Sequence, residues 1–289
     1  MIVRAISWNL FHGRDAPPNP ALHTWRSRLL KISEHDDRYV QVNRSLFAEF
    51  CSALAQMTWD IALLQECPPR WAAPLADSLG AQGHRVLTSR NWLPRVSALA
   101  ATLNPDLIGS AEGGSNLTLV RGELLAANDA VFDERREFVI RERRPERRTM
   151  GFARTRAGLC IANLHATNDR PELAAEEVMR AASAAVEWAG SAPLLFGGDL
   201  NMRPSHSPEV FAQLRERFGL AGAIAESIDH LLVRGADLID PPHPLDHPEV
   251  AREAGAAGPL GLWRREIGRR IRLSDHDPEG AALRIEDRT

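Results

Sequence analysis

The sequence predicts an α/β protein built from many β-strands and a few amphipathic helices. Ten short apolar runs, bounded by turn residues, have the length and composition of strands. Three longer segments carry apolar residues at helical spacing. The chain has 289 residues, 44% hydrophobic and 25% charged, which is typical of a globular protein and not of a disordered one.

The predicted strands begin at the N-terminus and recur along the whole chain. Several alternate apolar and polar residues, as half-buried strands do, and others are continuously apolar, as fully buried strands are. We predict strands at residues 2–9, 60–65, 84–88, 117–121, 124–132, 149–156, 159–165, 193–198, 228–234 and 280–285.

The predicted helices span residues 40–57, 171–189 and 207–218. The second has the clearest ends, because Pro171 stands at its start and Gly190 follows it. Two further segments, 12–38 and 235–263, are rich in proline or polar residues and predict long loops. Neither has the even composition of a linker, so we expect one domain over residues 1–289.

Length and composition also limit the class of protein. No run approaches the roughly 18 apolar residues of a transmembrane helix, so we expect no stable membrane insertion. The N-terminus lacks the pattern of a signal peptide. Three scattered cysteines match no zinc or disulfide spacing and favour a cytoplasmic location. The oligomeric state is left open.

Basic residues are unevenly distributed, although the net charge is −3. Residues 134–156 hold nine arginines and four glutamates, and residues 264–272 hold five arginines and one glutamate. One interpretation is a solvated surface whose charges pair with one another. The other is a rim that faces phosphate groups.

Polar side chains recur at the ends of six predicted strands. Each has an ordinary explanation as a turn residue, a cap or a hydrogen-bonded histidine. If the strands share a sheet, however, their ends converge, and the carboxylates crowd one cleft unless a cation lies among them. Carboxylate and amide oxygens select a hard ion such as Mg²⁺ over zinc. The residues are Asn9, Glu66, His165, Asp199 with Asn201, Asp229, and Asp275 with His276.

The ordered motifs WNL, LLQE, GGDLN, IDHLLV and SDHDP resemble those of the endonuclease/exonuclease/phosphatase superfamily, from Met1 to about Ile285. The resemblance implies a four-layer α/β fold, with two β-sheets packed face to face and helices on both outer sides. It also implies hydrolysis of a phosphoester with Mg²⁺, or alternatively Mn²⁺, as cofactor.

The resemblance assigns metal and water-positioning roles to five residues. Glu66 is implied as the principal Mg²⁺ ligand, with Asn9 and Asp275 beside it. Asp199 and Asn201 are implied to position the attacking water and the scissile phosphate. Two glycines before Asp199 are expected to let the backbone approach closely.

Four further residues are implied to act on the phosphate. His276 would stabilise its charge or serve as a base, and Asp229 would orient His276. His165 would contact the phosphate or the leaving group. Arg148 fits the arginine that precedes the strand before that histidine, with Arg147 as the alternative.

The motifs determine the substrate less closely than they determine the reaction. The active-site tyrosine of abasic-site and pancreatic-type enzymes has no counterpart, since the only tyrosine is Tyr39, and Asn116 stands in the matching stretch. The 57 residues from Asn9 to Glu66 leave room for a loop within 12–38 beside the cleft. The arginine-rich segments favour a nuclease that cleaves nucleic acid. The alternatives are a phosphoesterase of a lipid headgroup or small molecule and, least favoured, a non-catalytic binding module.

Overall fold

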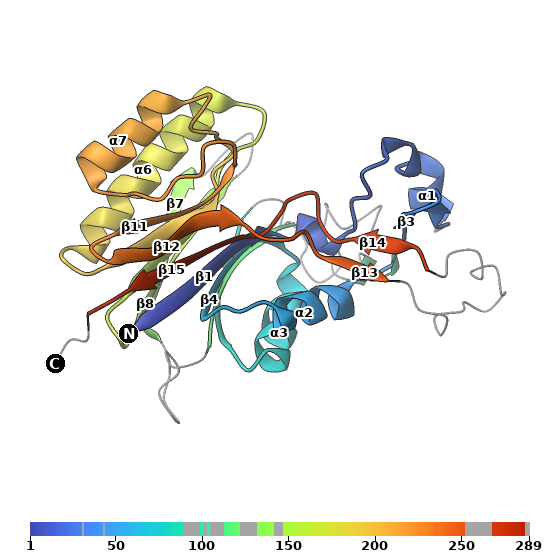
Figure 1. Ribbon diagram of the computed structural model, residues 1–289, viewed down its shortest axis with the longest axis horizontal. Coiled ribbons are helices and arrows are strands. Elements are labelled where there is room, and N and C mark those ends of the chain that lie inside the picture. The colour runs from blue at the N-terminus through green and yellow to red at the C-terminus, as the bar shows by residue number, and fades with distance from the viewer. Residues whose placement is uncertain are drawn as a thin grey trace.

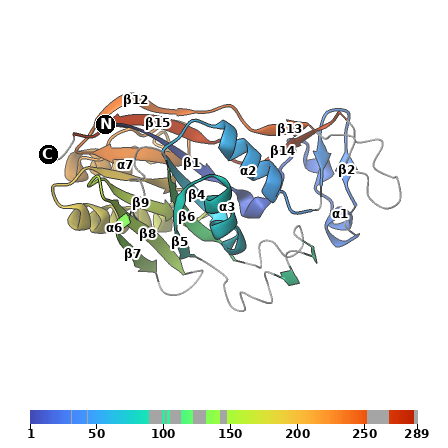
Figure 2. The ribbon, with the colours of Figure 1, turned by 90° about the horizontal axis from the view of Figure 1, so that it is seen from below.

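Two mixed β-sheets lie face to face at the centre of the protein (Figures 1 and 2). The computed structural model describes residues 1–30, 32–42, 44–88, 99–100, 103–104, 113–121, 132–141, 147–251 and 268–286. The first sheet has the order β12-β15-β1-β4-β6-β5 and the second β11-β10-β9-β8-β7.

The bounds of these strands agree with most of the sequence predictions. The first sheet contains β1 (Ile2–Asn9), β4 (Ile61–Cys67), β5 (Gln82–Leu87), β6 (Ser115–Val120), β12 (Asp237–Pro244) and β15 (Glu279–Arg284). The second contains β7 (Phe132–Arg141), β8 (Arg148–Thr155), β9 (Cys160–His165), β10 (Leu194–Asp199) and β11 (Asp229–Arg234). The predicted strand 124–132 lies outside the described residues except for Phe132.

Helices cover both outer faces, which confirms the four-layer fold. Helices α6 (Pro171–Ala189) and α7 (Pro208–Phe218) pack on the second sheet, and α2 (Phe47–Gln56) and α3 (Ala72–Ser78) on the first (Figure 1). Three buried apolar clusters separate the layers, and the one between the sheets includes Leu63, Ile161 and Leu231. Each fully buried side chain of this size contributes about 1.5–3 kcal/mol.

Helix α6 has the bounds that its sequence predicts. Its buried face is largely alanine, including Ala174, Ala181 and Ala185, so the helix can lie close to the sheet. The helix is followed by Gly190, whose positive φ of 59° is readily adopted by glycine.

The helix predicted over 40–57 begins too early, because α2 starts at Phe47. Residues Val40–Gln41 form β3 instead and pair with β2 (Glu34–His35). The backbone N–H of Val42 donates a 2.8 Å hydrogen bond to Oδ2 of Asp15. These tertiary contacts hold the segment extended, against its helical pattern.

Both predicted loops contain regular structure. Residues 12–38 include α1 (Trp25–Leu30) and β2, and 235–263 include β12 and β13 (Glu249–Ala251), which pairs with β14 (Arg270–Arg272). Strand β12 tolerates its three prolines because it is an edge strand with two register irregularities beside β15. None of the helices in the described ranges is long and apolar enough to cross a membrane.

Strand directions bring the polar strand ends together. Strands β1 and β4 are parallel, with Asn9 opposite Gln65, and β9 and β10 are parallel, with His165 opposite Asp199. Antiparallel neighbours begin where these strands end, so Asp229 at the start of β11 lies opposite Asp199. Strand β15 likewise starts near the end of β1.

Candidate active site

The converging strand ends line a cleft of about 640 Å³. Eight of the nine residues predicted for the site lie in its wall, and the ninth, Asp229, lies behind His276. The wall residues from that prediction are Asn9, Glu66, Arg148, His165, Asp199, Asn201, Asp275 and His276. The fold therefore assembles in one place the side chains that the sequence distributes over 268 positions.

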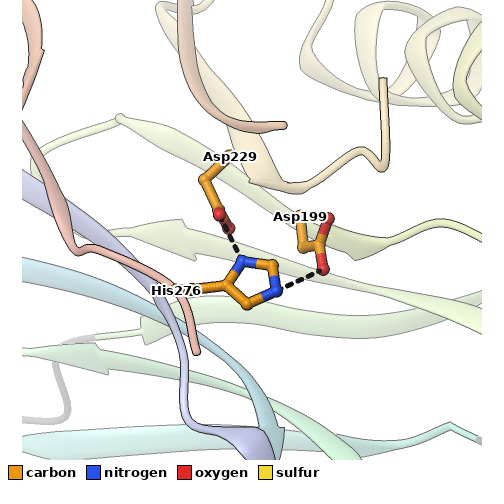
Figure 3. A group of neighbouring side chains, drawn as sticks. All are labelled: Asp199, Asp229 and His276. Atoms are coloured by element: carbon orange, nitrogen blue, oxygen red, sulfur yellow. Dashed lines mark hydrogen bonds and ion pairs between the residues drawn. The ribbon is translucent and has the colours of Figure 1, made fainter. Parts of the chain in front are cut away.

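His276 lies between two buried carboxylates (Figure 3). Its Nδ1 donates a 2.6 Å hydrogen bond to Oδ2 of Asp229, and its Nε2 lies 4.0 Å from Oδ2 of Asp199. Burial alone would lower the pKa of His276, but the hydrogen bond and negative charge of Asp229 raise it to about 10. The imidazole is therefore a cation at neutral pH.

Asp199 is held from two sides. Its Oδ2 accepts a 2.9 Å hydrogen bond from Asn9 Nδ2, and its Oδ1 accepts one of 2.9 Å from the backbone N–H of Asn201. Burial, followed by the charge of Asp229, raises the pKa of Asp199 to about 7. A carboxyl group with this pKa can exchange a proton near neutral pH.

Glu66 lies at a distortion of β4. The register of β4 against β6 is irregular between Leu64 and Cys67, and Glu66 has a φ of 47°. Burial would raise the pKa of Glu66, but charge interactions, chiefly with His12, lower it. Left-handed backbone is unfavourable for a glutamate and is found at functional sites that need a side chain re-aimed.

Left-handed residues cluster around this cleft. Of the six non-glycine residues with positive φ in the described part of the chain, five line the cleft and the sixth, Ser274, precedes Asp275. Asn201 is one of them, with a φ of 51°, and its Nδ2 donates a 2.9 Å hydrogen bond to the Ala166 carbonyl.

His165 and Arg148 face the cleft from the second sheet. His165 Nε2 lies 3.5 Å from Asp199 Oδ2, and burial, with the charge of Arg148, lowers the pKa of His165 to about 3. His165 is therefore neutral at physiological pH. Arg148 is buried in the cleft wall and its neighbour Arg147 is exposed, which favours Arg148 as the residue that meets the phosphate.

A buried carboxylate that the sequence did not single out supports Arg148. Glu177 of α6 accepts hydrogen bonds from the backbone N–H and the hydroxyl of Thr167, at 2.8 and 3.0 Å, and pairs with Arg141. Thr167 Oγ1 in turn accepts a 3.3 Å hydrogen bond from Arg148 Nε. Because Thr167 to Arg170 line the cleft, this network shapes one of its walls.

Two other predictions are refined by the structure, and one further residue joins the site. Gly197 and Gly198 do permit a close approach, but to neighbouring strands, since a Cβ on Gly198 would lie 2.0 Å from the Leu164 carbonyl oxygen. Asn116 is buried between the sheets and donates to the Thr149 carbonyl at 3.2 Å, away from the cleft. His12, which is not among the predicted site residues, lines the cleft and contacts Glu66 from the turn after β1.

The sequence matches a model of the Endonuclease/Exonuclease/phosphatase family over residues 6–276. The chain therefore belongs to this family of hydrolases and is a phosphoesterase. Comparison with curated proteins gives no match.

Several solved structures share the fold at low sequence identity. A mannosyl-6-phosphatase of Bacteroides thetaiotaomicron is 15% identical, with a TM-score of 0.60, covering 98% of this chain and 100% of its own. The catalytic domain of human Nocturnin with bound sulfate is 13% identical, with a TM-score of 0.56 and coverage of 99% and 94%. D. rerio TDP2 with single-strand DNA product is 14% identical, with a TM-score of 0.50 and coverage of 98% and 99%.

Proposed function

We propose that this phosphoesterase is a divalent-metal-dependent phosphodiesterase. The observation that carries the proposal is the placement of a cationic His276 beside a proton-exchanging Asp199, in a cleft that also contains Glu66. A positive group and a base on the same reacting centre are the elements that phosphate hydrolysis requires.

The donors around Glu66 fit a hard divalent cation. Burial, with the negative charge of Glu66, raises the pKa of Asp275, so a cation here would relieve the crowding of carboxylates. Asp199, Asp229 and His276 also bring ligand atoms within 4.8 Å of one another. Of these two possible sites, we choose Glu66. Nδ1 of His276 carries a proton that it donates to Asp229, and a protonated nitrogen does not bind a metal ion. Glu66 and Asp275 would hold the ion, which supplies Lewis-acid stabilisation of the phosphate.

Side chains of the protein perform the remaining steps of hydrolysis. Asp199 orients a water molecule and accepts its proton. His276 holds the non-bridging phosphate oxygens as their charge grows, and Asp229 keeps it protonated and oriented. Neutral His165 donates or accepts a hydrogen bond without adding charge. Arg148, which lines the same cleft, would contact the phosphate from the second sheet.

Nucleic acid is our first candidate for the substrate. Arg148 and Arg170 line the cleft, and Arg14 lies close enough to act on Glu66 electrostatically. The arginine-rich segments give less support than the sequence suggested. Arg270 pairs with Glu249 at 2.9 Å, and Arg272 pairs with Asp277 at 3.3 Å. Other arginines of these segments, including Arg143, Arg144, Arg264 and Arg265, lie outside the described residues.

A lipid phosphodiester is the second candidate, and one surface favours it. Large exposed apolar side chains of the described residues gather on α1, where Trp25 is 68% and Leu30 62% exposed, and on the nearby segment that contains Asn104. The two segments are joined by a 3.0 Å hydrogen bond from Asn104 Nδ2 to the Arg28 carbonyl. Exposed apolar patches of this kind mark contacts with membranes or other proteins.

The test is a substrate panel with and without Mg²⁺ or Mn²⁺. It contains plasmid DNA, single-stranded DNA and RNA, an abasic duplex, a chromogenic phosphodiester, and phosphatidylcholine vesicles with sphingomyelin. The proposal requires cleavage of at least one phosphodiester that chelation abolishes and that Glu66→Gln strongly reduces. Failure to cleave any phosphodiester of the panel with either ion would refute it.

Two further properties remain proposals. We retain one domain, and we retain a cytoplasmic location on the support of three free cysteines, two of them buried.

A further inference from the structure

His12 is the nearest nitrogen donor to the Glu66 carboxylate among the described contacts. Its Nε2 lies 3.2 Å from Glu66 Oε2, whereas His165 Nε2 lies 3.9 Å from Glu66 Oε1. The His12 side chain is 14% exposed and lines the cleft. The imidazole nitrogen therefore lies beside the position that a cation on Glu66 would take.

Asn9, the amide expected beside Glu66, is engaged by protein groups at both ends. Its Oδ1 accepts a 2.9 Å hydrogen bond from the Phe11 backbone N–H, and its Nδ2 donates one of 2.9 Å to Asp199. The amide thus shapes the turn that follows β1 and orients Asp199. The same turn brings His12 against Glu66.

The backbone around His12 is held in one conformation, which fixes the direction of the side chain. Phe11 and His12 are both left-handed, with φ of 48° and 54°, in the 3₁₀ turn η1 (Phe11–Gly13). The turn is tied to β4 by a 2.9 Å hydrogen bond from Leu10 N–H to the Gln65 carbonyl. Gly13 lies under Trp71, where a Cβ would come within 2.3 Å of the ring. Strain of this kind persists only where the surroundings enforce it.

We propose that His12 Nε2 is a ligand of the cation held by Glu66, and that this nitrogen makes the site prefer Mn²⁺ or another transition metal to Mg²⁺. The inference rests on the proposed function for the presence of a cation. Neighbouring ligands of an octahedral ion, each about 2.1 Å from it, lie about 3 Å apart, and the His12–Glu66 spacing fits that distance. Imidazole binds transition metals well, whereas Mg²⁺ favours oxygen.

The test measures metal binding and not only turnover. Mn²⁺ and Mg²⁺ affinities are determined by calorimetry for the full chain and for His12→Asn, and pulsed electron paramagnetic resonance detects nitrogen bound to Mn²⁺. Asparagine is chosen because it tolerates left-handed backbone and carries no imidazole. His165→Gln is the matched control, since His165 is the other histidine near Glu66.

We expect a histidine nitrogen signal in the natural protein and in His165→Gln, and its loss in His12→Asn. Mn²⁺ affinity should fall about tenfold or more in His12→Asn, with a smaller change for Mg²⁺. Mn²⁺ binding without a nitrogen signal in the natural protein would overturn the inference, whether or not the variant folds, and leave the proposed function standing. A signal that survives in His12→Asn would do the same. Failure of the natural protein to bind either ion would refute the proposed cation site as well.

Discussion

Asp229 and His276 are separated by 47 residues in the sequence, yet Oδ2 of the one accepts a 2.6 Å hydrogen bond from Nδ1 of the other. The pair raises the pKa of His276 above its ordinary value of 6.5 to about 10. Because the folded state then binds the proton more tightly, the stability from this pair is fully present below about pH 6.5. It is lost as the pH rises toward 10.

Asp229→Asn should therefore lower the pKa of His276 and reduce turnover. Loss of a positioned charge in a phosphate site costs about 10²–10³ in rate. Nuclear magnetic resonance titration of His276 and the alkaline limb of the pH–rate profile provide the measurements. Glu226→Gln is the control, because Glu226 is exposed nearby but does not hold His276. A His276 pKa that is unchanged by Asp229→Asn would contradict the assignment.

Glu66→Gln should weaken divalent-metal binding and leave the fold intact. Burial would raise the pKa of Glu66, but charge interactions, chiefly with His12, lower it, so the carboxylate is favoured in the folded protein. We therefore expect no gain in melting temperature without metal. Calorimetric titration with Mg²⁺ and Mn²⁺ checks the first statement and thermal unfolding the second. Unaltered affinity for both ions would place the cation elsewhere, with Asp199, Asp229 and His276 as the next candidates.

Glu279→Gln should stabilise the protein at alkaline pH. Glu279 is 2% exposed, its Oε2 has no hydrogen-bond partner, and burial followed by the charge of Asp229 raises its pKa to about 8. In the folded state it therefore holds a proton that the unfolded chain releases near its ordinary value of 4.5. The stability of the natural protein therefore falls as the pH rises from about 4.5 to about 8, and it stays low at higher pH.

Thermal unfolding of Glu279→Gln and the natural protein from pH 4 to pH 9 checks this expectation. The difference in melting temperature should grow with pH and level off above about pH 8. A difference that is constant across the range would show that Glu279 does not titrate as described.

Glu177→Gln should destabilise the fold and raise KM. The substitution leaves Arg141 without its buried charge partner, a change that typically costs about 3–5 kcal/mol. It also loosens Thr167, which lines the cleft and contacts Arg148. Denaturant unfolding and steady-state kinetics measure the two effects. Glu176→Gln, an exposed neighbour on α6, should behave like the natural protein, and equal effects of both variants would rule out the network.

Salt dependence separates the candidate substrates. If nucleic acid crosses the cleft, Arg170→Ala should flatten the slope of log K against log salt by about 0.7–0.9, because the variant neutralises one phosphate fewer. Arg270→Ala should leave the slope unchanged, because Arg270 pairs with Glu249. A shallow slope in the natural protein, together with binding to sphingomyelin vesicles that Trp25→Ser abolishes, would favour the lipid candidate.

Local pattern was sufficient for much of the fold and for most of the predicted site. Helix α6 could be predicted to the residue because its proline, glutamates and glycine act within one turn of each end. Asp199 and Glu66 could be recognised because each lies at the end of a buried strand. Segment 40–57 could not be divided correctly, since the contact of Val42 with Asp15 reaches back 27 residues.

The sequence by itself determined the polar strand ends and their chemical class, because alternation and strand length are local properties of the chain. Only the tertiary structure decided that His12 meets Glu66, that Glu177 holds Arg141, and that Glu279 is buried near Asp229. Each of these depends on how separate segments pack. The pKa of His276 likewise depends on distances and burial that no single segment contains, because charge interactions strengthen only when packing removes water from between the groups.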